Sequence, residues 1–303
     1  MGSVLERVPA GARVAVIRLR SMGDCILTTP ALAILKQSRP DLSIGVVVED
    51  RFAALMEGNP DVSTVLPPSI RSLREFGPRL CLNLHGGPRS LALTVLSGAR
   101  DTAGFAHFTA SFAYGTRIPT AQEILGVSRK VHTAEHLASA VFYLGVPPRE
   151  IPRARLFAQP PPESAPYAVL HPMATGTGKN WPAANFLQVA RQLEGSLGLQ
   201  PVFIGGPGED LSPFDGFRVL AGAPLDELKS VMSRASLFVG NDSGPAHMAA
   251  AFGVPVVVIF GNSDPVVWAP WRTSSQTVVA RGPIENVAVD EVLAAVHQLK
   301  VAA

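Results

Sequence analysis

Prolines are concentrated in one stretch of this 303-residue chain, between Val146 and Pro166. The stretch contains Pro147, Pro148, Pro152, Pro160, Pro161, Pro162 and Pro166. Proline has no backbone N–H and clashes with the preceding turn, so this density excludes a continuous helix or a central strand. We therefore expect an interdomain linker over residues 151–166, between a first domain over residues 1–150 and a second over residues 167–303. The chain is also longer than one typical domain core.

Strand-like and helix-like segments alternate before the linker. The strand-like runs are rich in β-branched residues and cover residues 14–19, 43–48 and 80–84. The helical patterns between and after them cover about residues 26–37, 51–57, 90–96 and 133–144. Strands separated by helices at this spacing are typical of βαβ units with a parallel sheet.

A second alternation follows the linker. Its strand-like runs are 168–170, 202–204, 237–239 and 256–260, and its helical patterns are 183–197, 225–233, 245–252 and 289–299. The sequence therefore predicts an α/β protein of two doubly wound domains. Two such domains in tandem are expected to face each other across a cleft, with ligands at the carboxyl ends of the strands.

Composition narrows the class of protein. Hydrophobic residues make up 47% and charged residues 17% of the chain, a globular balance, and the net charge of +2 does not indicate a nucleic-acid partner. The two cysteines, Cys25 and Cys81, lie in apolar runs without a CxxC pair, which indicates a reducing compartment. We see no signal-peptide pattern and no apolar run of the ~20 residues that span a bilayer. We expect a cytoplasmic protein.

The segment Gly240-Asn241-Asp242-Ser243-Gly244-Pro245-Ala246-His247 lies between a strand and a helix. Glycine and serine at a helix N-terminus expose backbone N–H groups, and the helix dipole adds partial positive charge there. This chemistry suits a phosphate. Asp and Ser at such a position are also common helix caps with no ligand, so both interpretations stay open on this segment alone.

Two further strand-to-helix loops carry polar groups. The loop 171–182 holds hydroxyls, glycines and Lys179, which suit a diphosphate, although Met173 and Asn180 exclude a Walker A motif. Glu209 closes the segment 205–209, where a carboxylate can accept hydrogen bonds from ribose hydroxyls. The spacing is not GxGxxG, which disfavours a dehydrogenase. A flexible loop and a plain turn are the alternatives for these two segments.

Asp24 follows the first strand in the segment 20–24. A carboxylate that faces an interdomain cleft is a candidate general base, whereas a helix cap is the structural alternative. The segment His132-Thr133-Ala134-Glu135-His136 matches the H-x-x-E-H zinc pattern. No convincing third ligand accompanies it, so we favour a helix N-terminus here and expect no metal site.

Taken together, these segments resemble glycosyltransferase family 9, the ADP-heptose:lipopolysaccharide heptosyltransferases. The matching segments stand in family order and span about residues 13–272. They are residues 17–24, 28–32, 171–172, 179–182, 205–209, 242–247, 260–265 and 270–271.

The resemblance implies a GT-B fold, made of two Rossmann-like domains, and an inverting, metal-independent sugar transfer. It also implies an ADP-sugar donor, ADP-heptose, with no cofactor. By matching positions, Asp24 deprotonates the acceptor hydroxyl, and Lys179 neutralises the leaving diphosphate. The remaining donor-binding positions serve the phosphates, the ribose and the sugar hydroxyls; they are Thr175, Thr177, Glu209, Asp242, Ser243, Gly244 and His247.

On the acceptor side, the resemblance implies a lipid-linked inner-core sugar of lipopolysaccharide, bound by the first domain. Arg20 and Arg89 are the candidate contacts. Residues 1–150 hold 16 Lys and Arg against 12 Asp and Glu, which agrees with an anionic partner. His85 and Pro88 depart from the commoner family pattern and leave the acceptor open. We expect peripheral contact with the inner face of the cytoplasmic membrane and no binding of nucleic acid.

Two other functions fit the same architecture. A GT-B nucleotide-sugar epimerase would convert the donor without an acceptor. A noncatalytic nucleotide-sugar-binding protein would have no use for Asp24, Lys179 and Asp242 together.

Overall fold

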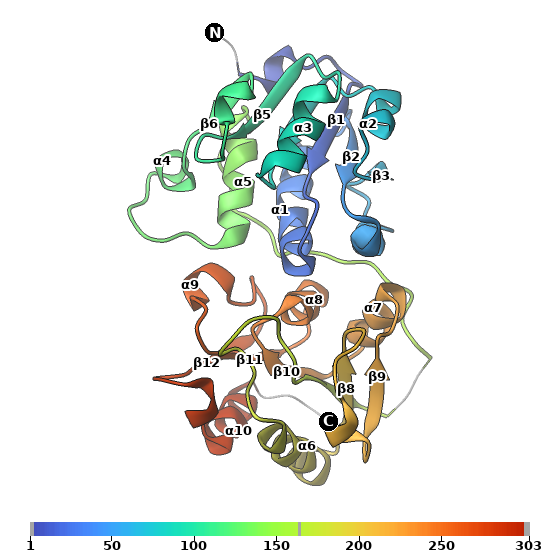
Figure 1. Ribbon diagram of the computed structural model, residues 1–303, viewed down its shortest axis with the longest axis vertical. Helices are drawn as coiled ribbons and strands as arrows, with labels where there is room; N and C mark the ends of the chain where they lie inside the picture. The colour runs from blue at the N-terminus through green and yellow to red at the C-terminus, as the bar shows by residue number, and fades with distance from the viewer. Residues whose placement is uncertain (1–2, 163–164, 300–303) are drawn as a thin grey trace. The chain divides into compact units, whose positions relative to one another are not determined.

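The computed structural model describes residues 3–162 and 165–299, which form two compact units. Unit 1 is Met1–Arg155 and unit 2 is Leu156–Ala303 (Figure 1). The division falls inside the proline-rich stretch, whose described residues, 146–162 and 165–166, contain no helix or strand. Ile151, Ala154 and Leu156 are nevertheless buried, so the connecting chain is packed against the protein at these positions.

Unit 1 contains a six-stranded parallel sheet in the order β3-β2-β1-β4-β5-β6. Its strands are β1 Arg13–Ile17, β2 Ser43–Val47, β3 Thr64–Leu66, β4 Leu80–Asn83, β5 Asp101–Phe105 and β6 Thr116–Ile118. Its helices are α1 Met22–Ser38, α2 Ile70–Phe76, α3 Pro88–Leu96, α4 Ala121–Leu125 and α5 Thr133–Tyr143. Helices α1 and α5 pack together, as do α2 and α3.

Helix α1 accommodates a proline in its interior. Pro30 cannot donate to the carbonyl of Ile26, and the hydroxyl of Thr29 donates to that oxygen instead, at 2.8 Å. The same hydroxyl accepts a hydrogen bond of 3.0 Å from the backbone N–H of Arg155. The Thr29-Pro30 pair therefore also anchors the end of unit 1 to its first helix.

Unit 2 contains a second six-stranded parallel sheet, in the order β12-β11-β10-β7-β8-β9. Its strands are β7 Tyr167–His171, β8 Gln200–Gly205, β9 Arg218–Ala221, β10 Leu237–Asn241, β11 Val256–Phe260 and β12 Ser275–Val279. Its helices are α6 Ala183–Leu197, α7 Leu225–Ser233, α8 Gly244–Phe252, α9 Pro265–Trp268 and α10 Val289–Gln298. Read from β9, this is the strand order of unit 1, with β7 in place of β1 and β10 in place of β4.

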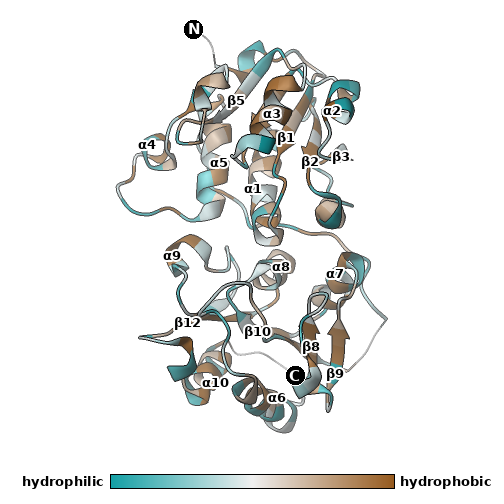
Figure 2. Cartoon of the chain, in the orientation of Figure 1, coloured by the Kyte–Doolittle hydropathy of each residue, from teal (hydrophilic) through white to brown (hydrophobic). Residues whose placement is uncertain are grey.

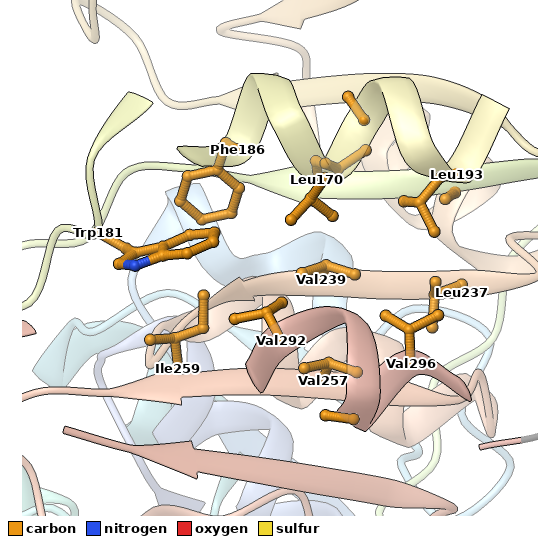
Figure 3. Close-up of a cluster of buried hydrophobic side chains, with 14 of the residues drawn as sticks. Leu170, Trp181, Phe186, Leu193, Leu237, Val239, Val257, Ile259, Val292 and Val296 are labelled. Atoms are coloured by element: carbon orange, nitrogen blue, oxygen red, sulfur yellow. The ribbon is translucent and has the colours of Figure 1, made fainter. Parts of the chain in front are cut away.

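Each unit has its own apolar core. Hydrophobic residues concentrate on strands such as β2 and β8 (Figure 2). In unit 2, Phe186 and Leu193 of α6 and Val292 and Val296 of α10 point toward one face of the sheet (Figure 3). They meet alternate residues of three central strands, which share that face because successive side chains of a strand point to opposite sides. These residues are Leu170, Leu237, Val239, Val257 and Ile259.

The structure confirms the predicted fold class of two parallel α/β sheets with flanking helices. One element is corrected: the segment expected as a helix over 51–57 is a short 3-10 helix, Asp50–Leu55. Five strands were not predicted from the sequence, namely the short outer strands β3, β6, β9 and β12 and also β5. Among the helices that the structure describes, none combines the length and apolar character needed to cross a bilayer.

Candidate active site

The polar loops of each unit gather where the strand order reverses. In unit 1 this point lies between β1 and β4, and in unit 2 between β7 and β10. Ligands of open α/β sheets bind at such switch points, beside the carboxyl ends of the strands. The predicted residue Asp24 follows β1, whereas Lys179 and Asp242 follow β7 and β10.

Asp24 lies in the first turn of α1. It takes part in capping the helix, and hydrogen bonds hold its carboxylate in place. Ser21 is the N-cap, and its backbone N–H donates to Oδ2 of Asp24 at 3.1 Å. The Ser21 hydroxyl donates to the same oxygen at 2.9 Å. The helix dipole also favours negative charge at this end of α1. The local sequence therefore fixes both the position and the orientation of the carboxylate.

Arg18 is a site residue that the sequence patterns did not indicate. Its guanidinium pairs with Oδ1 of Asp24 and donates to the backbone oxygen of Leu84. Only 12% of the Arg18 side chain and 17% of the Asp24 side chain are exposed, so solvent screens this pair less than a surface pair. Arg18 directly follows β1, at the edge of the sheet where functional side chains are expected, and this position is the signal that could have identified it.

The two candidate acceptor contacts, Arg20 and Arg89, lie on different segments of unit 1. Arg20 is exposed, next to Ser21. Arg89 lies in the first turn of α3, and its guanidinium is 3.5 Å from Glu49, which also accepts hydrogen bonds of 2.8 and 3.0 Å from Arg51. Two cations on one carboxylate leave a net positive charge on this part of unit 1.

In unit 2, the structure brings Lys179 and Asp242 together. Nζ of Lys179 lies 3.1 Å from Oδ2 of Asp242. The Asp242 side chain is 8% exposed and the Lys179 side chain is 29% exposed, so the cation has the better access to solvent. Lys179 can therefore turn toward an incoming anion, with Asp242 left to accept hydrogen bonds from hydroxyl groups.

Asn241, at the end of β10, fixes the loop that carries Lys179. Its side-chain amide donates to the backbone oxygen of Pro172 at 2.7 Å and accepts from the backbone N–H of Trp181 at 3.2 Å. Asn241 is fully buried, and Trp181 is 2% exposed. The loop is thus held at both ends by one side chain. An asparagine at the end of a predicted strand, directly before Asp242, was the available sequence signal for this role.

The glycines in and beside this loop permit its path. Gly176 and Gly178 have φ values of +116° and +69°, which side chains rarely adopt. A Cβ atom on Gly261 would lie 2.0 Å from the backbone oxygen of Gly178. The loops after β7 and β11 therefore touch backbone to backbone.

The segment that begins α8 contributes further polar groups. The hydroxyl of Ser243, the N-cap, forms a hydrogen bond of 2.9 Å with Nδ1 of His171 and donates to the backbone oxygen of Asn241 at 3.1 Å. Burial lowers the pKa of His171 to about 4, so its ring is neutral near pH 7. Gly244 and Pro245 lie in the first helical turn, as the sequence predicts for Pro245, and His247 is buried one turn further along.

The other predicted donor-side residues lie on the loops that follow β7 and β8. Thr175 and Thr177 are exposed on the Lys179 loop. Glu209 follows β8, and its carboxylate accepts a hydrogen bond of 2.6 Å from the backbone N–H of Gly206. The structure thus joins Lys179 to Asp242 directly, and the hydrogen bonds described for Glu209 stay within its own loop.

The H-x-x-E-H segment forms a helix start, as favoured from the sequence. His132 is the N-cap of α5, and its Nδ1 accepts from the backbone N–H of Ala134 at 3.0 Å. Glu135 accepts from the backbone N–H of His132 and pairs with Arg129. His136 stacks on Phe105, with ring centroids 4.1 Å apart. Within residues 3–162 and 165–299, no group of three or more His, Cys, Asp or Glu side chains is arranged to hold a metal ion.

Two parallel six-stranded sheets with flanking helices, each with polar loops at its switch point, define the class of doubly wound α/β proteins. The model of glycosyltransferase family 9 (heptosyltransferase) matches residues 69–291, and the chain belongs to this family. Lipopolysaccharide heptosyltransferase 3 of Escherichia coli is 27% identical over 84% of this chain and 83% of its own length.

Solved structures agree with this assignment at the level of the fold. The family 9 glycosyl transferase from Veillonella parvula superposes with a TM-score of 0.83 and 23% identity, over 95% of this chain and 97% of its own. The ADP-heptose lipopolysaccharide heptosyltransferase II of E. coli gives a TM-score of 0.80 at 20% identity, over 95% and 98% of the two chains. Both similarities extend over the GT-B architecture that the sequence predicts.

Proposed function

We propose that this glycosyltransferase moves heptose from ADP-heptose to a lipid-linked inner-core sugar of lipopolysaccharide, with inversion at the anomeric carbon and without a metal. The observation that carries the proposal is the Lys179–Asp242 pair beside the start of α8. A lysine next to a helix N-terminus suits a diphosphate, and a buried carboxylate beside it suits sugar hydroxyls. The names of the relatives supply the sugar and the acceptor class.

In this mechanism unit 2 is the donor-binding domain. As the bond between the anomeric carbon and the diphosphate breaks, negative charge grows on the leaving ADP. Lys179 and the N–H groups around Ser243 and Gly244 stabilise that charge. Groups already in position contribute most because they need little reorganisation. Thr175, Thr177 and His247 add hydrogen bonds near the phosphates in this proposal.

The remaining part of the donor, the ribose, is assigned to Glu209. Its carboxylate follows β8, the strand next to β7, and already accepts one backbone N–H. A second lone pair of the same carboxylate is available for a ribose hydroxyl. This assignment is independent of the Lys179–Asp242 pair.

Unit 1 is the acceptor-binding domain in this proposal. The acceptor hydroxyl oxygen forms the new bond to the anomeric carbon, and Asp24 takes the hydroxyl proton. The carboxylate is held ready by Ser21 and Arg18. Arg20 and Arg89 are the proposed contacts to acidic groups of the acceptor. Peripheral contact with the inner face of the cytoplasmic membrane is the proposed route to a lipid-linked acceptor.

The first experiment is a thermal-shift screen of the purified protein with ADP, UDP, GDP and CMP, each with magnesium and with EDTA. Selective stabilisation by ADP in EDTA supports the proposal, because a ligand that binds the folded state raises its stability by an amount that increases as Kd falls. A preference for another nucleotide contradicts the ADP donor. Loss of stabilisation in EDTA contradicts metal independence.

A second assay separates transfer from the alternatives. The protein is incubated with ADP-heptose alone and with a deacylated inner-core oligosaccharide. A transferase releases ADP at a rate that rises with the oligosaccharide concentration. Conversion of the donor to an isomer without acceptor would identify an epimerase, and binding without any turnover would identify a noncatalytic protein.

A further inference from the structure

The hydroxyl of Ser243 is turned away from the helix that this residue begins. Ser243 is the N-cap of α8, yet its side chain makes no capping hydrogen bond. Its Oγ lies 2.9 Å from Nδ1 of His171 and donates to the backbone oxygen of Asn241 at 3.1 Å. Serine is a favoured N-cap because its oxygen accepts from N–H groups of the first turn. Here the hydroxyl is engaged by groups at the ends of β7 and β10 instead.

Two other N-cap hydroxyls of the chain act in the usual way. At the start of α2, Oγ of Ser69 accepts from the backbone N–H of Ser72 at 3.4 Å. At the start of α4, Oγ1 of Thr120 accepts from the backbone N–H of Glu123 at 3.3 Å. The different behaviour at α8 therefore comes from the surroundings of Ser243 and not from the residue type.

His171 is the donor in its hydrogen bond with Ser243. A hydroxyl group has one proton, and that of Ser243 goes to the backbone oxygen of Asn241. Oγ therefore accepts from Nδ1 of His171, so Nδ1 carries the proton of the neutral ring. Burial lowers the pKa of His171 to about 4, which makes the neutral ring the form present near pH 7. The ring is 6% exposed, so its surroundings hold this donor in place.

The first turn of α8 is consequently left open. Within the part of the chain that the structure describes, no acceptor is found for the backbone N–H groups of Ser243 and Gly244. Pro245 has no N–H, and Ala246 donates to the backbone oxygen of Ser243 at 3.2 Å. A capping hydroxyl would lie over this turn and accept from Ala246, in front of the two open N–H groups. An anion that binds at this helix N-terminus therefore needs the hydroxyl to be held elsewhere.

We propose that His171 is a positioning residue for the donor: its Nδ1–H holds the Ser243 hydroxyl at the sheet, so that the N–H groups of Ser243 and Gly244 stay open to the diphosphate. The inference rests on the proposed function, in which these N–H groups bind the leaving ADP. It gives a task to a buried histidine that acts through Ser243 and not by contact with the donor.

Two substitutions of the ring test this role through the affinity for ADP, measured by calorimetry in EDTA. His171→Phe keeps an aromatic ring without the donor, so the Ser243 hydroxyl can turn toward the first turn. We expect the Kd for ADP to rise about tenfold, the factor that corresponds to the loss of one ordinary hydrogen bond. His171→Asn places an amide N–H near the position of Nδ1, so it should restore an affinity close to that of the wild type.

Removal of the hydroxyl separates this role from a purely structural one. His171→Phe should weaken ADP binding where Ser243 is present and have little effect in a Ser243→Ala background, where no hydroxyl can cover the first turn. The double variant should therefore bind ADP more tightly than His171→Phe alone. His297→Phe, at an exposed histidine of α10, is the control and should not change the Kd. Wild-type affinity in His171→Phe, or no recovery in the double variant, overturns the proposal.

Nitrogen NMR of the His171 ring gives a readout that needs no nucleotide. The proton should reside on Nδ1, and the Nδ1 signal should shift in Ser243→Ala because its hydrogen bond is lost. A neutral ring with its proton on Nε2 would overturn the proposal. If the wild type binds no ADP, the proposed donor fails instead, and the tautomer still decides whether His171 holds Ser243.

Discussion

Lys179 and Asp242 come from loops after two neighbouring strands and meet with Nζ and Oδ2 3.1 Å apart. The carboxylate is 8% exposed and the ammonium group belongs to a side chain that is 29% exposed. A carboxylate in this position needs a cation or hydrogen-bond donors, because burial penalises its charge. The loops after β7 and β10 are therefore held together by this ion pair, and an anion bound to Lys179 would separate its two members.

Lys179→Met should weaken both folding and catalysis. Without the cation, Asp242 loses its hydrogen bond to the Lys179 ammonium group. We therefore expect the free energy of unfolding in urea to fall by about 1–3 kcal/mol. Lys179→Met/Asp242→Asn should recover most of that loss. In the transfer assay kcat should fall roughly 10²–10³-fold, as for other losses of a charge-stabilising donor. A single variant as stable as the double variant would contradict this account.

Asp24→Asn should abolish most transfer and leave nucleotide binding intact. The amide keeps the size of the side chain and cannot take the acceptor proton, so kcat should drop roughly 10²–10⁴-fold. Thermal stabilisation by ADP, which depends on unit 2 in our proposal, should equal that of the wild type. Unchanged kcat would remove Asp24 from the role of base.

Asn241→Ala should destabilise unit 2, because it leaves the backbone oxygen of Pro172 and the N–H of Trp181 buried without their partner. Each such loss costs about 1–3 kcal/mol. Asn180→Ala is the matched control: Asn180 is exposed and accepts one hydrogen bond, from Ala174. Urea unfolding followed by tryptophan fluorescence gives the free energy of unfolding of both variants. Equal losses of stability would contradict the role of Asn241 in holding the Lys179 loop.

Gly261→Ala and Gly195→Ala should act in opposite directions. A Cβ on Gly261 meets backbone at 2.0 Å, so the contact between the two loops must open and ADP binding should weaken. Gly195 lies exposed in α6, where a Cβ atom would meet nothing within 4 Å, and alanine there should add about 0.5–1 kcal/mol to stability. Melting temperature and ADP affinity distinguish the two. Normal ADP affinity in Gly261→Ala would show that the loops can separate freely.

Acid should destabilise unit 2 through His171. Burial lowers the pKa of His171 to about 4 in the folded protein, against 6.5 as its ordinary value. The unfolded chain then binds the extra proton first, so the contribution is complete above pH 6.5 and is lost as the pH falls from 6.5 toward 4. His171→Asn retains a polar atom near Ser243 and should show a shallower dependence of unfolding free energy on pH. An identical slope would show that other groups cause the acid sensitivity.

The central strands and long helices could be predicted because their signals are local. The apolar run of β11 and the periodic pattern of α6 occupy the predicted residues in the structure. The short outer strands could not be recognised, since runs such as Thr64–Leu66 and Thr116–Ile118 are defined mainly by pairing with a neighbour. Their identity depends on tertiary contacts that a single sequence does not display.

The sequence predicts the types and positions of the candidate site residues. It predicts less well which side chains contact one another. Loops after parallel strands identify Asp24, Lys179 and Asp242 because ligands of such folds bind there. Arg18 and Asn241 were not predicted although each lies at the end of a central strand, because their roles depend on the partners that their side chains find in the folded chain. The close backbone contact between the loops of Gly178 and Gly261 likewise can be recognised only in the folded structure.

Both sheets repeat one strand order, and each places its polar loops at the corresponding reversal point. A substitution that reshapes the loops of one sheet leaves the hydrogen-bond ladder and core of the other intact. In the proposed division of acceptor and donor between the two units, a chain of this kind can exchange one substrate and keep the other, so hybrids between family members, joined near Arg155, are a route to new pairs of sugar and acceptor.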